Sequence, residues 1–254
     1  TRSVDGGSIY YDVDYDALEE VISARTRLFL LSNPHNPTGQ MYGRYDLERM
    51  ADICIRHDLV ICSDEIHCEL LLDGQHHQPI ATLSPEIAER CITLMAPSKT
   101  FNLAGLSCGF AIIQNHNLRA RLEAARVGMV PRAVNVMGYV GALAALRDGD
   151  EWLGQLLPYL AANRDYLVEY ITEYMPAILS TRPQATYLAW LDCNLAGIDG
   201  NPREFFLDRA KVALNDGEPF GPGGKGFVRI NFACPRSTLT EAVERMRAAL
   251  EELC

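Results

Sequence analysis

Short apolar runs alternate with helical patterns through the first half of the chain, and this alternation limits the folds open to it. The apolar runs are Leu28–Ser32, Leu59–Ser63, Arg90–Ala96 and Gly109–Gln114. Apolar residues recur at helical spacing over Asp16–Ala24 and Tyr45–His57. Strands that alternate with helices form βαβ units, so the sequence predicts an α/β fold with a mostly parallel sheet.

The pattern changes after about Arg147. A long helical pattern with apolar residues spaced for burial covers Glu151–Tyr174 and contains Pro158. The elements expected after it are strands at Ala185–Leu191 and Gly226–Phe232, a helix near Arg203–Lys211, and a C-terminal helix with an apolar stripe at Leu239, Val243, Met246 and Leu250. We therefore expect a large α/β domain at 1–147 and a smaller α+β domain at 148–254.

The first fourteen residues are polar and contain two glycines, which predicts a loop leading into the first helix. The chain begins with Thr1 and not with Met, which is typical of a start inside a longer sequence.

Charge and composition argue against several partners. The net charge of -10 is unsuited to nucleic acid, because phosphate backbones require clustered lysine and arginine. No apolar run approaches the roughly 20 residues that span a bilayer, and the first residues do not resemble a signal peptide. We expect a cytoplasmic protein that binds neither nucleic acid nor membranes.

The eight cysteines contain no C-x-x-C pair, and several lie in apolar patterns, which is typical of reduced, buried thiols. The cysteines and histidines closest together in the sequence are Cys62, His67, Cys68, His76 and His77. Their spacing fits no metal motif, so we expect no metal site.

Lys99 is the residue that points most directly to chemistry. It is one of three lysines in a chain with 20 arginines, and it lies in the partly apolar run Met95–Leu106. Arginine cannot be deprotonated in a protein and cannot form an imine, whereas a desolvated lysine can do both. Lys99 is therefore a candidate Schiff-base residue, although a lysine that only extends from a strand end to solvent would fit this position as well.

Two other polar residues occupy positions like that of Lys99. Asn36 follows the first predicted strand, Asp64 follows the second, and Lys99 follows the third. Ligands of α/β sheets bind at the carboxyl ends of the strands, so we expect the three side chains to converge on one crevice. Taken singly, Asp64 could be a helix cap and Asn36 a turn residue.

Four motifs, in this order and approximate spacing, resemble the fold-type I pyridoxal-phosphate enzymes of the aminotransferase class I/II family. They are Asn33–Gly39, Ser63–His67, Ala96–Asn102 and Phe227–Asn231. The segments that resemble the MalY/PatB branch of cystathionine β-lyase-like carbon–sulfur lyases in particular are Asp64–His67, Ser98–Leu106, Glu151–Leu153 and Ala185–Asp192. The resemblance implies a three-layer large domain, here incomplete, beside a small α+β domain, and a homodimer.

The resemblance also implies a cofactor, pyridoxal 5'-phosphate, and roles for the residues that hold it. Lys99 would bind it covalently as an imine and then act as general base at the substrate Cα. Asp64 would keep the pyridine nitrogen protonated. The remaining roles are hydrogen bonds to the phenolic oxygen from Asn36, with assistance from His67, and contact with the phosphate by Ser98.

Arg229 is implied to bind the substrate carboxylate, which suits a bidentate guanidinium. The implied substrate is cystathionine or another cysteine S-conjugate, and β-elimination would give pyruvate, ammonia and a thiol. Many aminotransferases of this superfamily carry an arginine eight residues after the lysine, where this chain has Ser107. That departure favours the lyase branch, but it leaves transamination open.

Complete family members have a long segment before the region where this chain starts, and we expect the chain to be N-terminally truncated. Three hypotheses follow: a carbon–sulfur lyase or a fragment of one, an aminotransferase, and a non-catalytic homologue that serves as an oligomerisation or regulatory module. The expected truncation would leave apolar sheet surface exposed unless another chain covers it.

Overall fold

The computed structural model describes residues 1–129 and 133–253, and the chain forms two compact units. Unit 1 consists of Thr1–Asp12, His35–Gln40 and Leu156–Cys254, and unit 2 of Val13–Pro34 and Met41–Gln155. The expected domains were divided once, at residue 148. The compact units differ from them, because Thr1–Asp12 and His35–Gln40 belong to the same unit as the C-terminal residues. The division at 148 stays a prediction about domains.

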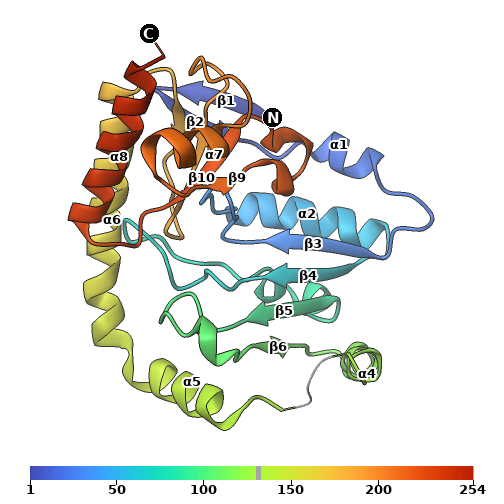
Figure 1. Ribbon diagram of the computed structural model, residues 1–254. Coiled ribbons are helices and arrows are strands. Elements are labelled where there is room, and N and C mark those ends of the chain that lie inside the picture. The colour runs from blue at the N-terminus through green and yellow to red at the C-terminus, as the bar shows by residue number, and fades with distance from the viewer. Residues whose placement is uncertain (130–132, 254) are drawn as a thin grey trace. The chain divides into compact units, whose positions relative to one another are not determined.

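Unit 2 is built on a four-stranded sheet in the order β3-β4-β5-β6. The strands are β3 (Leu28–Ser32), β4 (Val60–Asp64), β5 (Cys91–Met95) and β6 (Phe110–Ile112). β3, β4 and β5 are parallel, as their arrows in Figure 1 show, and β6 runs antiparallel to β5. The predicted α/β fold class with a mostly parallel sheet is confirmed.

One face of this sheet is covered by helix α2 (Arg44–Arg56). The helix buries Leu47, Met50 and Ala51 in one apolar cluster with Leu31 of β3 and Ile61 of β4. The other helices of unit 2 are α1 (Tyr15–Glu20), α3 (Pro85–Ala88), α4 (His116–Ala125) and α5 (Val136–Asp148), with 3-10 turns η1 (Ile80–Thr82) and η2 (Ala104–Leu106). The predicted helix at Asp16–Ala24 is therefore confirmed in its first turns only.

The opposite face of the same sheet is open to solvent. Leu28 and Leu30 of β3 are 46% and 71% exposed, and Leu94 of β5 is 38% exposed. Residues paired across neighbouring strands share a face, and the register pairs Leu30 with Cys62 and Asp64 with Leu94. These side chains form a continuous apolar surface with Asp64 at its carboxyl end.

Unit 1 contains a six-stranded sheet in the order β1-β2-β7-β8-β10-β9. Its strands are β1 (Arg2–Asp5), β2 (Ser8–Tyr11), β7 (Leu179–Thr181), β8 (Leu188–Asp192), β9 (Asn215–Asp216) and β10 (Phe227–Asn231). All pairings are antiparallel except that of β2 with β7. The loop predicted for the first fourteen residues is wrong, because the chain forms a hairpin there and buries Ile9 beside Trp190 and Phe227.

Two long helices accompany this sheet, α6 (Asp150–Tyr174) and α8 (Arg236–Glu251), and a short helix α7 (Pro202–Phe205) continues into a π turn, η3 (Phe206–Ala210). The buried Asn163 of α6 donates hydrogen bonds of 2.9 Å to the carbonyls of Phe232 and Cys234 and so fixes the approach to α8. The predicted apolar stripe of α8 is buried at its first three positions, and Ala249 takes the place of half-buried Leu250 at the fourth.

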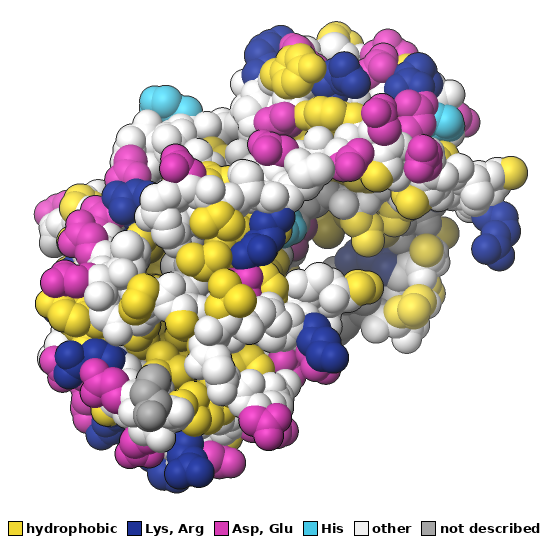
Figure 2. All heavy atoms as spheres, turned by 90° about the horizontal axis from the view of Figure 1, so that it is seen from above, with side chains coloured by type: hydrophobic (Ala, Val, Ile, Leu, Met, Phe, Trp, Pro, Cys, Tyr) yellow, Lys and Arg dark blue, Asp and Glu magenta, His cyan; other side chains and the backbone are white. Residues whose placement is uncertain are grey.

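Charged side chains of both signs are interspersed over the face drawn in Figure 2. Among the helices in the described residues, none combines the length and apolar character needed to cross a membrane.

Candidate active site

Asn36 lies in a loop that leaves β3 but packs within unit 1. The backbone N–H of Gly39 donates to the carbonyl of His35 at 2.8 Å, and the amide of Gln40 donates to the carbonyl of Tyr11 at 2.7 Å. Gly39 has φ +69°, and a Cβ there would lie 2.4 Å from that of Pro183, so only glycine permits this approach. The half-buried Asn36 is thereby held in unit 1.

Asn36 and Arg229 are brought together although they are 193 residues apart in the sequence. Arg229, on β10, donates from Nη1 to Asn36 Oδ1 at 2.7 Å and from Nη2 to Asn215 Oδ1 at 3.0 Å. Its guanidinium carbon lies 5.0 Å from the ring centroid of Phe220, on the 3-10 turn η4 (Glu218–Phe220). Two amide oxygens and one aromatic ring therefore fix the plane of the guanidinium.

Arg229 carries a partly buried charge. Burial lowers the pKa of its guanidinium, with a smaller opposing contribution from Tyr187. Its Nε is buried and makes no hydrogen bond, and among the described residues no carboxylate forms an ion pair with it. A partly buried cation held only by neutral acceptors favours an incoming anion, because that anion would pair the charge.

Asp64, at the end of β4, belongs to unit 2 and is exposed. Its Oδ1 accepts a hydrogen bond of 3.1 Å from the backbone N–H of Ile66, which fixes the side chain in a turn. His67 follows three residues later and is buried, 4% exposed. The strand therefore ends in the carboxylate of Asp64, which is accessible to solvent or a ligand. The imidazole of His67 follows and is buried inside unit 2.

Ser98 and Lys99 lie in the turn that follows β5, the strand next to β4. Lys99 is half-buried, and within the described residues its amine makes no hydrogen bond or ion pair. The turn is fixed by Phe101, whose N–H donates to the Pro97 carbonyl at 2.9 Å. The Phe101 ring lies 5.8 Å, centroid to centroid, from that of Trp152 in α6.

A buried network at the end of β4 was not found by sequence reasoning. Glu65 is 1% exposed; it accepts a hydrogen bond of 2.9 Å from Ser63 Oγ and lies 2.8 Å from His77 Nε2. A buried carboxylate needs such partners, and these link the strand end to the loop that contains His77. The adjacent acidic residues Asp64 and Glu65 were a possible signal. Successive side chains of an extended segment point to opposite faces, and the structure was needed to show that Asp64 faces solvent and Glu65 the interior.

The cysteines show no paired chemistry in the part of the chain that the structure describes. Cys54, Cys62, Cys68, Cys91, Cys108, Cys193 and Cys234 are all free. Burial raises the pKa of the Cys91 thiol to about 12. Within residues 1–129 and 133–253, no group of three or more histidine, cysteine, aspartate or glutamate side chains is placed to hold a metal ion.

The parallel sheet and the polar residues at its strand ends define an α/β protein of the class that binds ligands at the carboxyl ends of its strands. The chain belongs to the aminotransferase class I and II family, whose model matches residues 8–246. Cystathionine beta-lyase PatB of Bacillus subtilis is 36% identical over 242 residues, which cover 94% of this chain and 62% of PatB.

Solved structures agree with this assignment. The crystal structure of OvoB matches with a TM-score of 0.91 and 44% identity, over 98% of this chain and 64% of that one. Cystalysin from Treponema denticola, whose structure contains a pyridoxal 5'-phosphate cofactor, matches with a TM-score of 0.93 and 30% identity, over 100% of this chain and 64% of cystalysin. The chain thus spans less than two thirds of the length of these relatives.

Proposed function

We propose that this chain carries the catalytic residues of a pyridoxal 5'-phosphate-dependent carbon–sulfur β-lyase, acting on cystathionine or another cysteine S-conjugate. The observation that carries the proposal is the parallel arrangement of β4 and β5, because it puts Asp64 and the Lys99 turn at the carboxyl ends of neighbouring strands. Support for the lyase reaction comes from the similarity to PatB and from Ser107, where many aminotransferases carry arginine.

The residues present suit the cofactor chemically. Lys99 offers an amine with no other partner in the described residues, and Asp64 offers an exposed carboxylate for a protonated ring nitrogen. Ser98 would contact the phosphate, and Asn36, assisted by His67, the phenolic oxygen. When bound, the cofactor supplies an electron sink that makes the substrate Cα–H bond acidic.

Two of the chain's own residues would then act on the substrate. Lys99 would take the proton from the substrate Cα, which allows the Cβ–S bond to break with its electron pair leaving on sulfur. The thiolate takes up a proton, and water releases the remaining three-carbon unit as pyruvate and ammonia. Arg229 would hold the substrate carboxylate through both terminal nitrogens and so fix the direction of the Cα–H bond.

The test is pyruvate release from cystathionine by the full-length natural protein. We expect Lys99→Ala to abolish pyruvate release and the visible absorbance of bound cofactor, while Lys225→Ala, which removes an exposed lysine, leaves both unchanged. Wild-type absorbance with no pyruvate from any cysteine S-conjugate would reject the lyase assignment.

An aminotransferase is the second candidate, favoured by one relative in particular. Aromatic-amino-acid aminotransferase 2 of Thermococcus litoralis is 29% identical over 245 residues, 95% of this chain and 62% of that protein. Amino transfer to a 2-oxo acid that exceeds pyruvate release would select this function.

The third candidate, a non-catalytic module, is favoured by the open sheet face of unit 2. It predicts that the 254-residue chain binds no cofactor at stoichiometric concentration, which equilibrium dialysis measures. The homodimer and the cytoplasmic location remain predictions.

A further inference from the structure

The carboxylate of Asp64 depends for its position on the backbone that carries it. Among the described residues, its side chain accepts a hydrogen bond only from the N–H of Ile66, at 3.1 Å, and it is otherwise exposed. A side chain that acts on a ligand has to be held within about 0.5 Å of its productive position. The strand end that carries Asp64 therefore has to be fixed by other residues.

Backbone hydrogen bonds hold this strand end on three sides. The carbonyl of Asp64 accepts from the N–H of Asn33 at 3.0 Å, and the N–H of Glu65 donates to the carbonyl of Leu94 at 2.9 Å. The carbonyl of Glu65 accepts from the N–H of Cys68 at 3.0 Å. These bonds tie β4 to the residue after β3, to β5 and to the turn that follows β4.

The side chain of Glu65 adds an anchor inside unit 2. It is 1% exposed, accepts a hydrogen bond of 2.9 Å from Ser63 Oγ and lies 2.8 Å from His77 Nε2. An ionised carboxylate can only accept hydrogen bonds, so both partners donate to it. Because Ser63 belongs to β4 and His77 to the loop that precedes η1, the carboxylate joins the strand to that loop.

The imidazole of His77 depends on Glu65 in turn. Its side chain is 9% exposed, and within the described residues its buried Nδ1 makes no hydrogen bond. Without the carboxylate, Nε2 would lose its partner as well, and buried polar atoms without partners are costly. Loss of Glu65 therefore loosens the loop together with the strand end.

We propose that Glu65, held by Ser63 and His77, is a positioning residue that fixes Asp64 for the ring nitrogen of the cofactor. Successive side chains of an extended segment point to opposite faces, and here Asp64 is exposed whereas Glu65 is buried. Glu65 therefore acts through the backbone of Asp64 and makes no contact with the cofactor. This role rests on the proposed function, in which Asp64 pairs with the ring nitrogen, and it is the same for a lyase and an aminotransferase.

The test measures how tightly the full-length natural protein binds pyridoxal 5'-phosphate and an analogue in which carbon replaces the ring nitrogen. Glu65→Gln keeps the size of the side chain and removes its charge. We expect it to raise the dissociation constant of the natural cofactor at least about fivefold, because the buried hydrogen bonds to a charged group are lost. That of the analogue should change less than about twofold, because the analogue already lacks the interaction that Asp64 makes.

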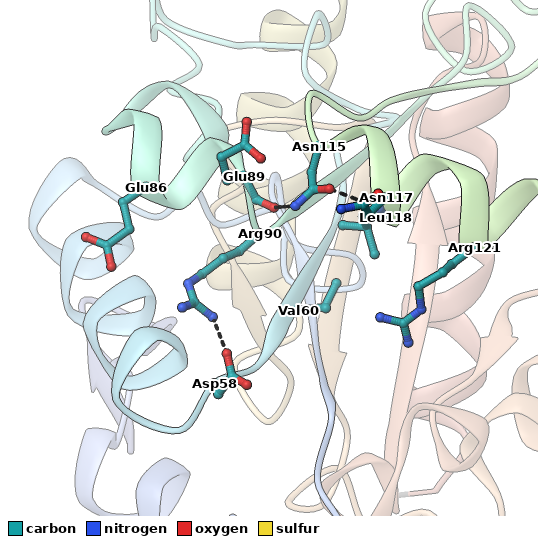
Figure 3. A pocket seen from close by; sticks show the side chains of 9 residues that line it. All are labelled: Asp58, Val60, Glu86, Glu89, Arg90, Asn115, Asn117, Leu118 and Arg121. Atoms are coloured by element: carbon teal, nitrogen blue, oxygen red, sulfur yellow. Dashed lines mark hydrogen bonds and ion pairs between the residues drawn. The ribbon is translucent and has the colours of Figure 1, made fainter.

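Glu86→Gln is the matched control, and it should leave both dissociation constants unchanged. Glu86 belongs to α3 in unit 2, is exposed and forms no ion pair among the described residues. Figure 3 shows its side chain separate from the ion pair of Arg90 with Asp58, 3.0 Å between Nη1 and Oδ1. Asp64→Asn should weaken binding of the natural cofactor at least as much as Glu65→Gln does.

Ser63→Ala, which removes one donor to Glu65, is the second variant should Glu65→Gln fail to fold by circular dichroism, and its effect should have the same direction. Two results would overturn the role of Glu65. One is unchanged affinity in Glu65→Gln where Asp64→Asn weakens binding, and the other is an equal loss for both ligands, which indicates a general structural role. Unchanged affinity in Asp64→Asn would reject the role of Asp64 in the proposed function, and the role of Glu65 with it.

Discussion

The two sheets of this protein differ in how completely their apolar strands are buried. In unit 1, all five residues of β8 are buried, because strands flank it on both sides and side chains cover both faces. In unit 2, β3 alternates between buried Leu31 and exposed Leu30. Within the residues that the structure describes, β8 is therefore buried on both faces and β3 on one face only. The difference teaches that apolar composition alone does not bury a strand, because burial also depends on which elements cover each face of the sheet.

The largest expected effect tests this difference in stability. Leu167 of α6 is fully buried in unit 1, and Leu167→Ala should lower the free energy of unfolding by about 2–5 kcal/mol. Leu30→Ala in unit 2, at a 71% exposed position, should change it by less than about 0.5 kcal/mol. Urea denaturation measures both. Equal losses would show that the exposed face of the unit 2 sheet is covered in solution and would break the comparison.

The next largest effect is expected at Arg229, the candidate substrate-binding residue of unit 1. Arg229→Ala should lower kcat/KM of the full-length protein about 10- to 150-fold, since hydrogen bonds to a charged group contribute about 1.5–3 kcal/mol. We expect most of the loss in KM, because the residue would bind the substrate carboxylate and not move a proton. Steady-state kinetics with cystathionine measures both constants. A loss confined to kcat contradicts the assigned role.

A smaller effect is expected at Asn215, which positions Arg229 through a hydrogen bond of 3.0 Å and lies at an exposed site. Asn215→Ala should raise KM by about 2- to 12-fold, because one neutral hydrogen bond contributes about 0.5–1.5 kcal/mol. Asn215→Asp offers a charged acceptor to the same nitrogen and should raise KM further, since its carboxylate would compete with that of the substrate. Unchanged KM in both variants would remove Asn215 from the site.

The smallest effect concerns an exposed cluster of unit 2, in which Glu19 accepts hydrogen bonds from Arg56 and His57. These bonds lower the pKa of Glu19 from 4.5 to about 2. A lowered pKa in the folded state stabilises the protein above pH 4.5, and this contribution is lost as the pH falls toward 2. Glu19→Gln should therefore be slightly less stable than the wild type at pH 6, and the difference should vanish near pH 2. Thermal unfolding followed across this range measures it.

The sequence predicted best those elements whose pattern is local. The run Leu28–Ser32 was located to the residue, and the apolar stripe of α8 was right at Leu239, Val243 and Met246. The hairpin β1–β2 was missed because its burial depends on β7, which lies about 170 residues away and pairs Ser8 with Ser180. β1 itself is exposed throughout, so no apolar alternation marked it.

The residues of the candidate site also fall into two groups, those that a local sequence pattern indicates and those that it does not. Strand-end positions pointed to Asp64 and Lys99, because parallel strands place their carboxyl ends at one edge. Asn215 and Phe220 were not found, since neither has a local signal and each is defined by its contact with Arg229. Contacts between residues distant in sequence come from the fold, and residue type and spacing alone could not reveal them.

The path of the backbone between the units has a consequence for how this protein can be divided. The chain passes from one unit to the other four times, after Asp12, Pro34, Gln40 and Gln155. Neither unit is a single stretch of sequence, so no one protease cut and no truncation of the gene at a single point releases either of them whole. An engineered exchange of unit 1 must therefore transplant three segments together, and an exchange of unit 2 must transplant two.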